Sequence, residues 1–402
     1  MKICLITNFY KPYKDWPKVY PEIIAEELAR ENEVIVITLR PFSGLGSLKA
    51  SIEDSGSIKV YRFYPLNVYS LHYPPKHHPS WIKAIWHLID IWNLHSYFVI
   101  KQILKKEKPD IVHTLRVDGL SASVFAAVKA SGCPHAHTLL DGALISPWAA
   151  LLRNGKTINF NFFDRQYMKA RRFLSESVDM VLASYNFLLD IHLQNGYFKG
   201  RPVRVFPYPV RLRPSVLKSK SYTPINLLCV GAIVAGKGIY VLLDAFKKLN
   251  RSDVNLHFIG MGAELEELKK AAHGLKNVSI QGYISDEDLV EMYSRANITI
   301  VPTLFPEDNP FVTIESFSFG TPVIASNLNG IPETITDGLN GRLFEPGDSL
   351  ALKDALDDLI SDHDKLREME AEALKSAEKY SLGKHISNLL EIYRSLVHAS
   401  TL

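Results

Sequence analysis

The segment from Glu307 to Glu315 combines two carboxylates with the start of a predicted helix. Asn309 is a favourable N-cap residue, and Pro310 suits the first helical position. Glu307 then lies in the loop before the helix, while Glu315 lies about one and a half turns inside it, at ~3.6 residues per turn. Because a helix N-terminus offers free N–H groups and the positive end of a dipole, this segment is suited to bind phosphate. One carboxylate could then contact a sugar and the other a ribose.

Glycine-bearing loops end or follow the predicted strands 225–231, 254–260 and 277–281. Open α/β sheets bind ligands beyond the carboxyl ends of their strands, so these loops are candidate ligand contacts. Lys237 stands in the first loop, directly before a predicted helix over 239–249, where an ammonium group can neutralise a diphosphate leaving group. Each feature alone is weak, because glycines after strands are common turn residues and most such lysines are solvated.

From Val301 to Asp348 the chain resembles the retaining GT-B glycosyltransferases of glycosyltransferase family 4, which use nucleotide sugars. The resemblance rests on the two spaced glutamates, the run Gly320-Thr-Pro-Val-Ile-Ala, the loop Gly330-Ile-Pro-Glu and the turn Asn340-Gly341, in that order. An ordinary loop, helix and strand with solvated carboxylates would explain either glutamate alone, but not the joint pattern.

The resemblance implies an α/β fold with the GT-B architecture: two Rossmann-like, doubly wound parallel-sheet domains and a cleft between them. It implies that Glu315 binds the ribose and that Glu307 holds the sugar and diphosphate together with the backbone from Asn309 to Val312. The implied catalytic residues are Glu307, Lys237 and Asp141. The implied donor-binding residues are Gly231, Lys237, Gly260, Tyr283, Ile284, Asn309, Pro310, Phe311, Val312 and Glu315.

Three positions depart from the family pattern. The arginine that many members carry after the first glycine is replaced by Ala232, and the histidine that often precedes the aspartate of the N-terminal domain is replaced by Leu140. The paired glycines after the first strand are replaced by Val19-Tyr-Pro-Glu22. Asp141 remains on the acceptor side, with a turn or helix cap as its alternative role. His113 is a second acceptor-side candidate, with a structural histidine as the alternative.

The chain of 402 residues is too long for one core and suits two domains. Strands and helices alternate in both halves, which predicts parallel, doubly wound sheets. A proline-rich and charged segment near 207–224 breaks the first alternating unit. The predicted domains are therefore 1–208, an acceptor-binding domain joined by a C-terminal helix over 385–402, and 209–384, a nucleotide-sugar-binding domain.

Charge is distributed unevenly between the two halves. Residues 1–210 carry a net charge of +9 and the remainder −6, which indicates an anionic partner for the first half. No zinc-finger, RNA-recognition or basic-zipper pattern supports nucleic acid. The segment 64–106 mixes aromatic and basic residues, and charged and polar residues interrupt its stretch 81–100, which excludes a transmembrane helix. Two interpretations stay open: a helix at an anionic membrane surface, or a helix packed with its aromatics inward.

Cysteine and histidine usage indicates neither a disulfide framework nor a metal site. Cys4, Cys133 and Cys229 are an odd number and widely spaced, and the histidines lack ligand spacing. The apolar run that follows Met1-Lys2 is too short and too unlike a signal peptide to direct export. We therefore expect a cytoplasmic protein, peripheral at the inner face of the membrane if the first interpretation of 64–106 holds, with no cofactor besides the donor.

The predicted function is transfer of a hexose from a nucleoside diphosphate sugar, expected to be a UDP-sugar, to an acceptor hydroxyl with retention. The acceptor could be a lipid-linked saccharide in polysaccharide or glycoconjugate synthesis. Two alternatives remain: a nucleotide-sugar epimerase of the same architecture, and a catalytically weak nucleotide-sugar-binding subunit, which the replacements at Ala232 and Leu140 would suit.

Overall fold

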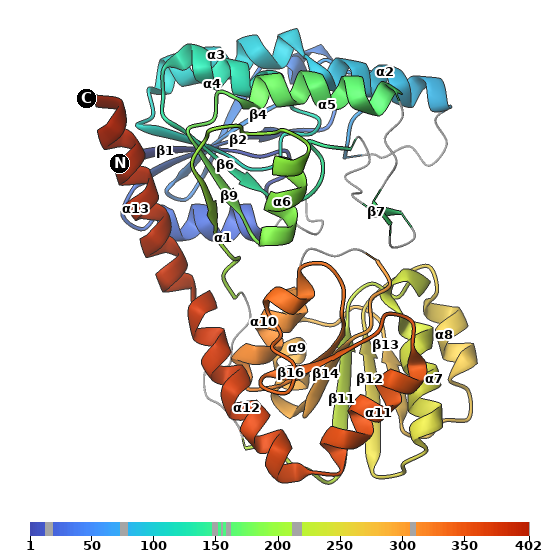
Figure 1. The fold of residues 1–402 in the computed structure, drawn as a ribbon. Helices are drawn as coiled ribbons and strands as arrows, with labels where there is room; N and C mark the ends of the chain where they lie inside the picture. Colours follow the sequence, from blue (N-terminus) through green and yellow to red (C-terminus); the bar gives the residue numbers. More distant parts are fainter. Residues whose placement is uncertain are drawn as a thin grey trace. The chain divides into compact units, whose positions relative to one another are not determined.

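The computed structural model describes residues 1–12, 19–72, 79–146, 152–153, 156–157, 162–210, 219–305 and 311–401. The chain divides into two compact units (Figure 1). Unit 1 comprises Met1–Leu151, Ile158–Pro207 and Ile386–Leu402, and unit 2 comprises Leu152–Thr157 and Tyr208–His385.

Unit 1 is built on an eight-stranded sheet with the order β10-β9-β6-β5-β1-β2-β4-β3. All neighbouring strands run parallel except β3, which pairs antiparallel with β4. The strands are β1 (Lys2–Ile6), β2 (Glu33–Leu39), β3 (Ser51–Ser55), β4 (Ile58–Phe63), β5 (Ile111–Thr114), β6 (His135–Leu139), β9 (Met180–Ala183) and β10 (Val203–Val205).

The strand order of unit 1 reverses between β1 and β5, which makes their carboxyl ends the switch point of this sheet. The helices are α1 (Val19–Leu28), η1 (Leu45–Leu48), α2 (Ser80–Ile91), α3 (Leu94–Glu107), α4 (Ser123–Ser131), α5 (Phe162–Ser175) and α6 (Asn186–Gln194). The last helix, α13 (Leu382–Thr401), starts in unit 2 and continues into unit 1. Its Tyr393 is buried and lies 2.6 Å from a ring nitrogen of His113 on β5.

Unit 2 is built on a six-stranded, all-parallel sheet with the order β13-β12-β11-β14-β15-β16. This is the Rossmann order, and its switch point lies between β11 and β14. The strands are β11 (Ile225–Val230), β12 (Val254–Ile259), β13 (Val278–Gln281), β14 (Ile298–Val301), β15 (Val323–Ser326) and β16 (Gly341–Phe344). A short pair, β7 (Leu152–Arg153) and β8 (Lys156–Thr157), forms a separate antiparallel ribbon.

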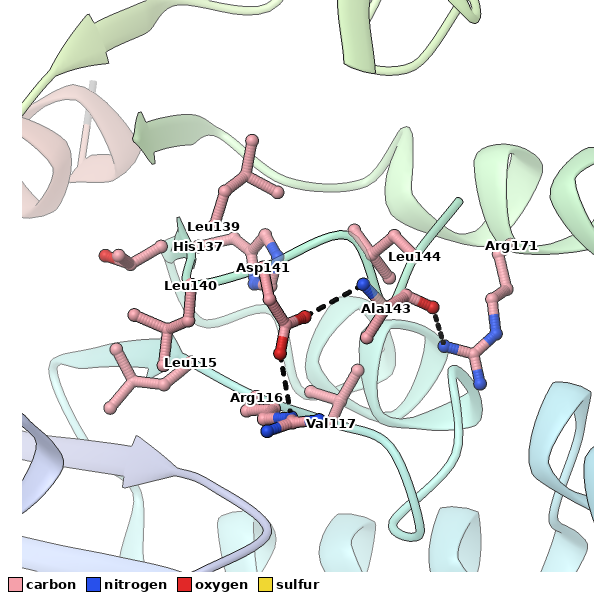
Figure 2. A pocket seen from close by; sticks show the side chains of 11 residues that line it. Leu115, Arg116, Val117, His137, Leu139, Leu140, Asp141, Ala143, Leu144 and Arg171 are labelled. Carbon is pink, nitrogen blue, oxygen red and sulfur yellow. Dashed lines mark hydrogen bonds and ion pairs between the residues drawn. The ribbon is translucent and has the colours of Figure 1, made fainter. Parts of the chain in front are cut away.

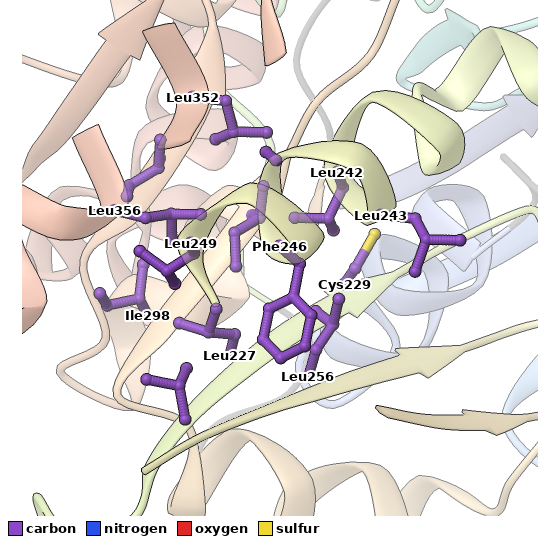
Figure 3. Packing of buried hydrophobic residues seen from close by; sticks show 14 of the residues in the cluster. Leu227, Cys229, Leu242, Leu243, Phe246, Leu249, Leu256, Ile298, Leu352 and Leu356 are labelled. Carbon is purple, nitrogen blue, oxygen red and sulfur yellow. The ribbon is translucent and has the colours of Figure 1, made fainter. Parts of the chain in front are cut away.

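Successive residues of β11 point to opposite faces of the unit 2 sheet. Both faces are therefore apolar, and helices cover both of them. Leu227 and Cys229 join the core under α7 (Ile239–Leu249) and α11 (Ser349–Ile360) (Figure 3). Leu228 packs on the other face with Tyr293 of α9 (Asp286–Arg295). The helices are η2 (Ala235–Lys237), α7 (Ile239–Leu249), α8 (Leu265–Ala271), α9 (Asp286–Arg295), α10 (Phe311–Ser318), η3 (Ile331–Glu333), α11 (Ser349–Ile360), α12 (His363–Ala377) and η4 (Glu378–Tyr380).

The predicted α/β class with two parallel-sheet units is confirmed. The predicted helix 239–249 agrees with α7 to the residue, and the predicted strands 225–231, 254–260 and 277–281 agree with β11, β12 and β13 to within one residue. The segment 81–100 is interrupted and forms parts of two helices, α2 and α3, because Asn93 caps α3 by accepting a hydrogen bond from the amide of Ser96 at 3.0 Å.

Candidate functional site

The loops after β11 and β12 of unit 2 lie backbone against backbone. A Cβ atom on Gly260 would lie 1.8 Å from the carbonyl oxygen of Gly231, and one on Gly262 would lie 2.1 Å from that of Ile233. The amide of Ile233 donates to the carbonyl of Met261 at 2.9 Å. Only glycine permits this approach, so the glycine pattern of the sequence has a steric cause. The result is a shelf of main-chain groups at the carboxyl edge of the sheet.

The loop after β14 joins this shelf beside Lys237. The amides of Leu304 and Phe305 both donate to the carbonyl of Gly236, at 2.8 and 3.1 Å. A Cβ atom on Gly238 would lie 1.8 Å from the carbonyl oxygen of Pro302, and Gly238 has a φ of +71°, in the left-handed region. Lys237, which is half-buried, is thus fixed at the switch point between β11 and β14, where the first and fourth strands of this unit end.

Glu315 occupies a buried position in α10 of the same unit. Its side chain is 4% exposed, and the hydroxyl of Tyr293 from α9 donates to its Oε2 atom at 3.1 Å. Phe311, the first residue of α10, is buried and stacks on Tyr208 with ring centroids 5.0 Å apart. A buried carboxylate held by a tyrosine can accept hydrogen bonds from ligand hydroxyl groups in a defined geometry.

The remaining predicted donor residues lie at two places. Tyr283 and Ile284 follow β13. The ring of Tyr283 is highly exposed, so it is accessible for stacking on a planar group. Val312 is in the first turn of α10. Glu307, Asn309 and Pro310 lie outside the described residues, so their predicted roles stay predictions.

The switch point of unit 1 is built from charged side chains. The amide of Asn8, after β1, donates to the carbonyl of Arg116, after β5, at 2.8 Å. The Nε atom of Arg116 lies 2.7 Å from Asp118 Oδ1. It also lies 3.1 Å from Asp141 Oδ2 (Figure 2). Asp141 therefore lies at the carboxyl edge of the unit 1 sheet, and it is paired with Arg116, a cation that sequence analysis did not identify.

Asp141 has a geometry that suits both roles predicted for it. Its Oδ1 atom accepts the amide of Ala143 at 2.8 Å, which is a turn contact, and its side chain is 21% exposed. Burial raises the pKa of Asp141, while Arg116 opposes that shift. Arg116, Asp141 and the apolar side chains of Leu115, Val117, Leu139 and Leu140 line a small pocket (Figure 2). Leu140 thus makes part of this wall apolar at the position where many family members carry a histidine.

A buried ion pair supports this pocket from behind. Arg171 of α5 and Asp90 of α2 are fully buried and bonded to each other. Arg171 also donates to the carbonyl of Ala143 at 3.2 Å, and Asp90 accepts the amide of Gly119 at 2.7 Å. The pair therefore fixes the loops after β5 and β6, which carry Arg116 and Asp141. Burial raises the pKa of Asp90 to about 6 although Arg171 lowers it.

His113 lies in the core of unit 1, away from this pocket's lining. Both its ring nitrogens are within hydrogen-bond distance of hydroxyl groups, at 2.6 Å from Tyr393 and 2.7 Å from Thr138. This is the structural histidine that the sequence left open as the alternative. No local sequence motif marks Asp90, Arg116 or Arg171 as part of a site. The one available signal was Asp90 itself, a charged residue inside an apolar helix.

Two further observations concern the described part of the chain. Within it, no three histidine, cysteine or acidic side chains gather in a way that could hold a metal ion. Its helices include none that is both long and apolar enough to cross a membrane.

Comparison with known proteins agrees with this geometry. Residues 218–376, which include all six strands of the unit 2 sheet, match the family described as Glycosyl transferases group 1. The chain is 27% identical over 342 residues to an uncharacterized 42.6 kDa protein in the cps region of Klebsiella pneumoniae, covering 83% of this chain and 87% of that protein.

Two further similarities cover part of the chain and nearly all of it, respectively. A phosphatidyl-myo-inositol mannosyltransferase of Mycobacterium leprae is 32% identical over 164 residues, covering 40% of this chain and 43% of that protein. HepE from Anabaena, solved in complex with UDP, superposes with a TM-score of 0.70 at 16% identity, covering 98% of this chain and 100% of that one. The chain is therefore a glycosyltransferase of the GT-B architecture, and its unit 2 carries the match to the glycosyl transferases group 1.

Proposed function

We propose that the protein transfers a sugar from UDP-sugar to an acceptor hydroxyl with retention at the anomeric carbon, as a member of glycosyltransferase family 4. The observation that carries the proposal is the carboxyl edge of unit 2, where the glycine shelf, Lys237 and the Glu315 helix converge within residues 218–376. The choice of uridine is supported by the UDP complex of HepE.

In this proposal the diphosphate lies along the glycine shelf. Lys237 neutralises the charge that develops on the leaving diphosphate. Such electrostatic stabilisation of the transition state is usually the largest contribution to lowering the activation barrier. Glu315 accepts hydrogen bonds from the ribose, and Tyr283 stacks on the base. Glu307 is assigned to the sugar by the family resemblance alone. Asp141 in unit 1 is assigned to the acceptor side, where its carboxylate can orient a hydroxyl group.

The acceptor is proposed to be a saccharide hydroxyl, carried on a lipid. The name of the Mycobacterium leprae relative includes a lipid acceptor, phosphatidyl-myo-inositol. The pocket beside Asp141 is small and largely apolar in its described part, and we assign it to the part of the acceptor next to the reacting hydroxyl.

Product analysis with UDP-sugars tests the reaction. Transfer yields free UDP and a glycoside, an epimerase yields a second UDP-sugar, and a binding subunit yields neither. NMR of the anomeric proton then reports retention or inversion. A thermal-shift screen with UDP, GDP and ADP tests the base, because a ligand at a hundred times its Kd stabilises the folded state by about 2.7 kcal/mol. A larger shift with GDP or ADP than with UDP would contradict the uridine assignment.

Variants of the donor edge separate binding from chemistry. Lys237→Ala is expected to lower turnover by about a hundredfold with little change in stability. The control Lys353→Ala alters a half-buried lysine of α11 that pairs with Asp354 and Asp357, and it should leave turnover unchanged. Glu315→Ala is expected to weaken calorimetric binding of UDP itself by about tenfold, since its partner is the ribose. Wild-type turnover in Lys237→Ala, or unchanged UDP affinity in Glu315→Ala, would remove these roles.

A further inference from the structure

Helix α2 of unit 1 turns an apolar face outward. Between Trp81 and Ile91 its exposed side chains are Trp81, Ala84, Ile85 and Leu88, which lie on one stripe at helical spacing. Trp81 is 63% exposed and Leu88 67%. A surface helix in water has the opposite arrangement, with polar side chains outward. An exposed apolar stripe of this kind indicates that something other than water covers it.

The stripe continues across the junction into α3. Trp92 follows α2 and is exposed, and its ring stacks on Tyr97 with centroids 5.9 Å apart. Tyr97 in turn meets the ring of Phe98 at 5.3 Å. Leu94 and Phe98 are also exposed. We name these residues together the α2–α3 strip: Trp81, Ile85, Leu88, Trp92, Leu94 and Phe98.

Basic residues extend the strip along α3. Lys101 and Lys105 follow Leu94 by seven and eleven residues, which places all three on one face of the helix. The Nζ atom of Lys101 lies 5.4 Å from the ring centroid of Tyr97, so the lysine touches the aromatic cluster itself. An apolar strip that passes into lysines is complementary to a layer with an apolar interior and an anionic surface.

The acidic groups of these two helices do not oppose that charge. Asp90 of α2 is buried against Arg171, and Glu107 at the end of α3 is buried and paired with Lys2 and Lys59. Lys2 and neighbouring hydrogen bonds hold the pKa of Glu107 at about 2 although burial opposes them. Both carboxyl groups are therefore committed to partners inside unit 1, and the exposed charged side chains of α2 and α3 are lysines.

We propose that the α2–α3 strip is an interfacial membrane-binding surface, with Trp81, Leu88 and Trp92 in the headgroup region and Lys101 and Lys105 on anionic headgroups. Tryptophan is the side chain most enriched at that depth of a bilayer. A second copy of the chain fits less well, because a two-fold contact through the same patch brings its lysines close to their own copies. The inference does not rest on sugar transfer, since it uses no residue of the donor edge.

The test is sedimentation of the full chain with vesicles of phosphatidylcholine alone or with 30 mol% phosphatidylglycerol, at low and at high salt. The wild-type protein is expected to sediment with the anionic vesicles at low salt and to be released at high salt, because lysine contacts with headgroups are screened. Trp81→Gln/Leu88→Gln and Lys101→Gln/Lys105→Gln are each expected to lower the partition coefficient about tenfold or more.

Matched controls come from unit 2. Leu350→Gln alters a leucine of similar exposure, 59%, on α11, and Lys269→Gln/Lys270→Gln removes two lysines from α8. Neither is expected to change vesicle binding. Retention of the wild type in the supernatant, equal binding by strip and control variants, or a change of oligomeric state in place of vesicle binding would overturn the proposal. Calorimetry with UDP on the same proteins is expected to show unchanged affinity, which keeps this result separate from the proposed donor function.

Discussion

Each of the two sheets carries a candidate site at its carboxyl edge, and the loops of the two edges are stabilised by different kinds of contact. At the edge of unit 2, glycine loops from β11 and β12 and the loop after β14 touch through main-chain atoms. At the edge of unit 1, loops after β5 and β6 are held by Arg116, Arg171 and Asp90, which come from three distant parts of the chain. The first arrangement leaves a local pattern in the sequence, and the second does not.

The difference has a functional consequence. A main-chain shelf presents the same amide groups whatever the neighbouring side chains are, which suits an invariant diphosphate. A side-chain pocket can change its charge and shape by single substitutions, which suits an acceptor that differs between related enzymes. The replacement of a histidine by Leu140 lies in the second kind of site, and it alters the lining without touching a main-chain contact.

The largest expected effect follows from removing the buried Arg171–Asp90 ion pair of unit 1. Arg171→Met leaves Asp90 buried without its cation, so we expect a loss of about 3 to 5 kcal/mol in the free energy of unfolding. All five tryptophans lie in the first 150 residues, so tryptophan fluorescence in urea reports unit 1. Arg172→Met, at a half-exposed neighbour, is the control, and we expect it to cost less than about 1 kcal/mol.

A paired variant sharpens the same prediction. Asp90→Leu/Arg171→Met removes both charges, and it should recover most of the stability that Arg171→Met loses, because no buried charge then lacks a partner. If Arg171→Met and Arg172→Met unfold at the same urea concentration, the ion pair does not support the pocket.

Acid should weaken unit 1 through its buried histidines. Burial lowers the pKa of His135 well below its usual value, that of His137 to about 3 and that of His192 to about 4. The unfolded chain therefore binds these protons first, and stability falls as the pH drops below about 6.5. Asp90, with a pKa raised to about 6, takes up one proton in the folded state and offsets part of this loss.

The net expectation is a loss of about 2 kcal/mol per pH unit between pH 6 and pH 4.5, measured by tryptophan fluorescence in urea. His192→Gln should reduce this slope by nearly half, since two histidines remain while Asp90 still offsets about one proton. A slope that is flat, or that is the same in the variant, would show that these histidines do not govern the acid stability of unit 1.

A smaller effect is expected when the shelf of unit 2 is disturbed. Gly238→Ala places a methyl group against the carbonyl of Pro302 and should weaken UDP binding about tenfold or more in calorimetry. Gly274→Ala is the control, because Gly274 also has a positive φ, +86°, but its Cβ would meet nothing within 4 Å. It should cost about 1 to 2 kcal/mol of stability and leave UDP affinity unchanged. Equal affinity losses would mean that backbone strain, and not the close contact, matters at Gly238.

The smallest expected effect follows from restoring the arginine of the family pattern at Ala232. Ala232 is exposed on the loop after β11, at the position where the family pattern of the sequence analysis has an arginine. Ala232→Arg should raise UDP affinity about fivefold, because a guanidinium group can bond a diphosphate at two points. Ala232→Lys, which adds a charge without the two-point geometry, should gain less. Unchanged or weaker binding in both would indicate that the diphosphate lies elsewhere on the shelf.

The sequence by itself determined the α/β class, the strands near 225–231, 254–260 and 277–281 and the helix 239–249 of the donor unit, and the glycine loops around Lys237. It could do so because these features depend on neighbours along the chain: strand and helix periodicity, helix caps, and glycines where no Cβ atom fits. Its choice of Asp141 also came from a local run of residues; the structure shows that this residue lines a pocket, and its acceptor role stays a prediction.

Only the tertiary structure decided which charged residues meet. Asp90 and Arg171 are 81 positions apart, and their pairing depends on how α2 packs on α5. The same packing turned Asp90 inward and left Trp81 and Leu88 outward, so the sequence could list the aromatic residues of 64–106 without saying which of them face solvent. Long-range contacts of this kind are set by the whole core, because a buried charge is tolerated only where its partner arrives from elsewhere in the fold.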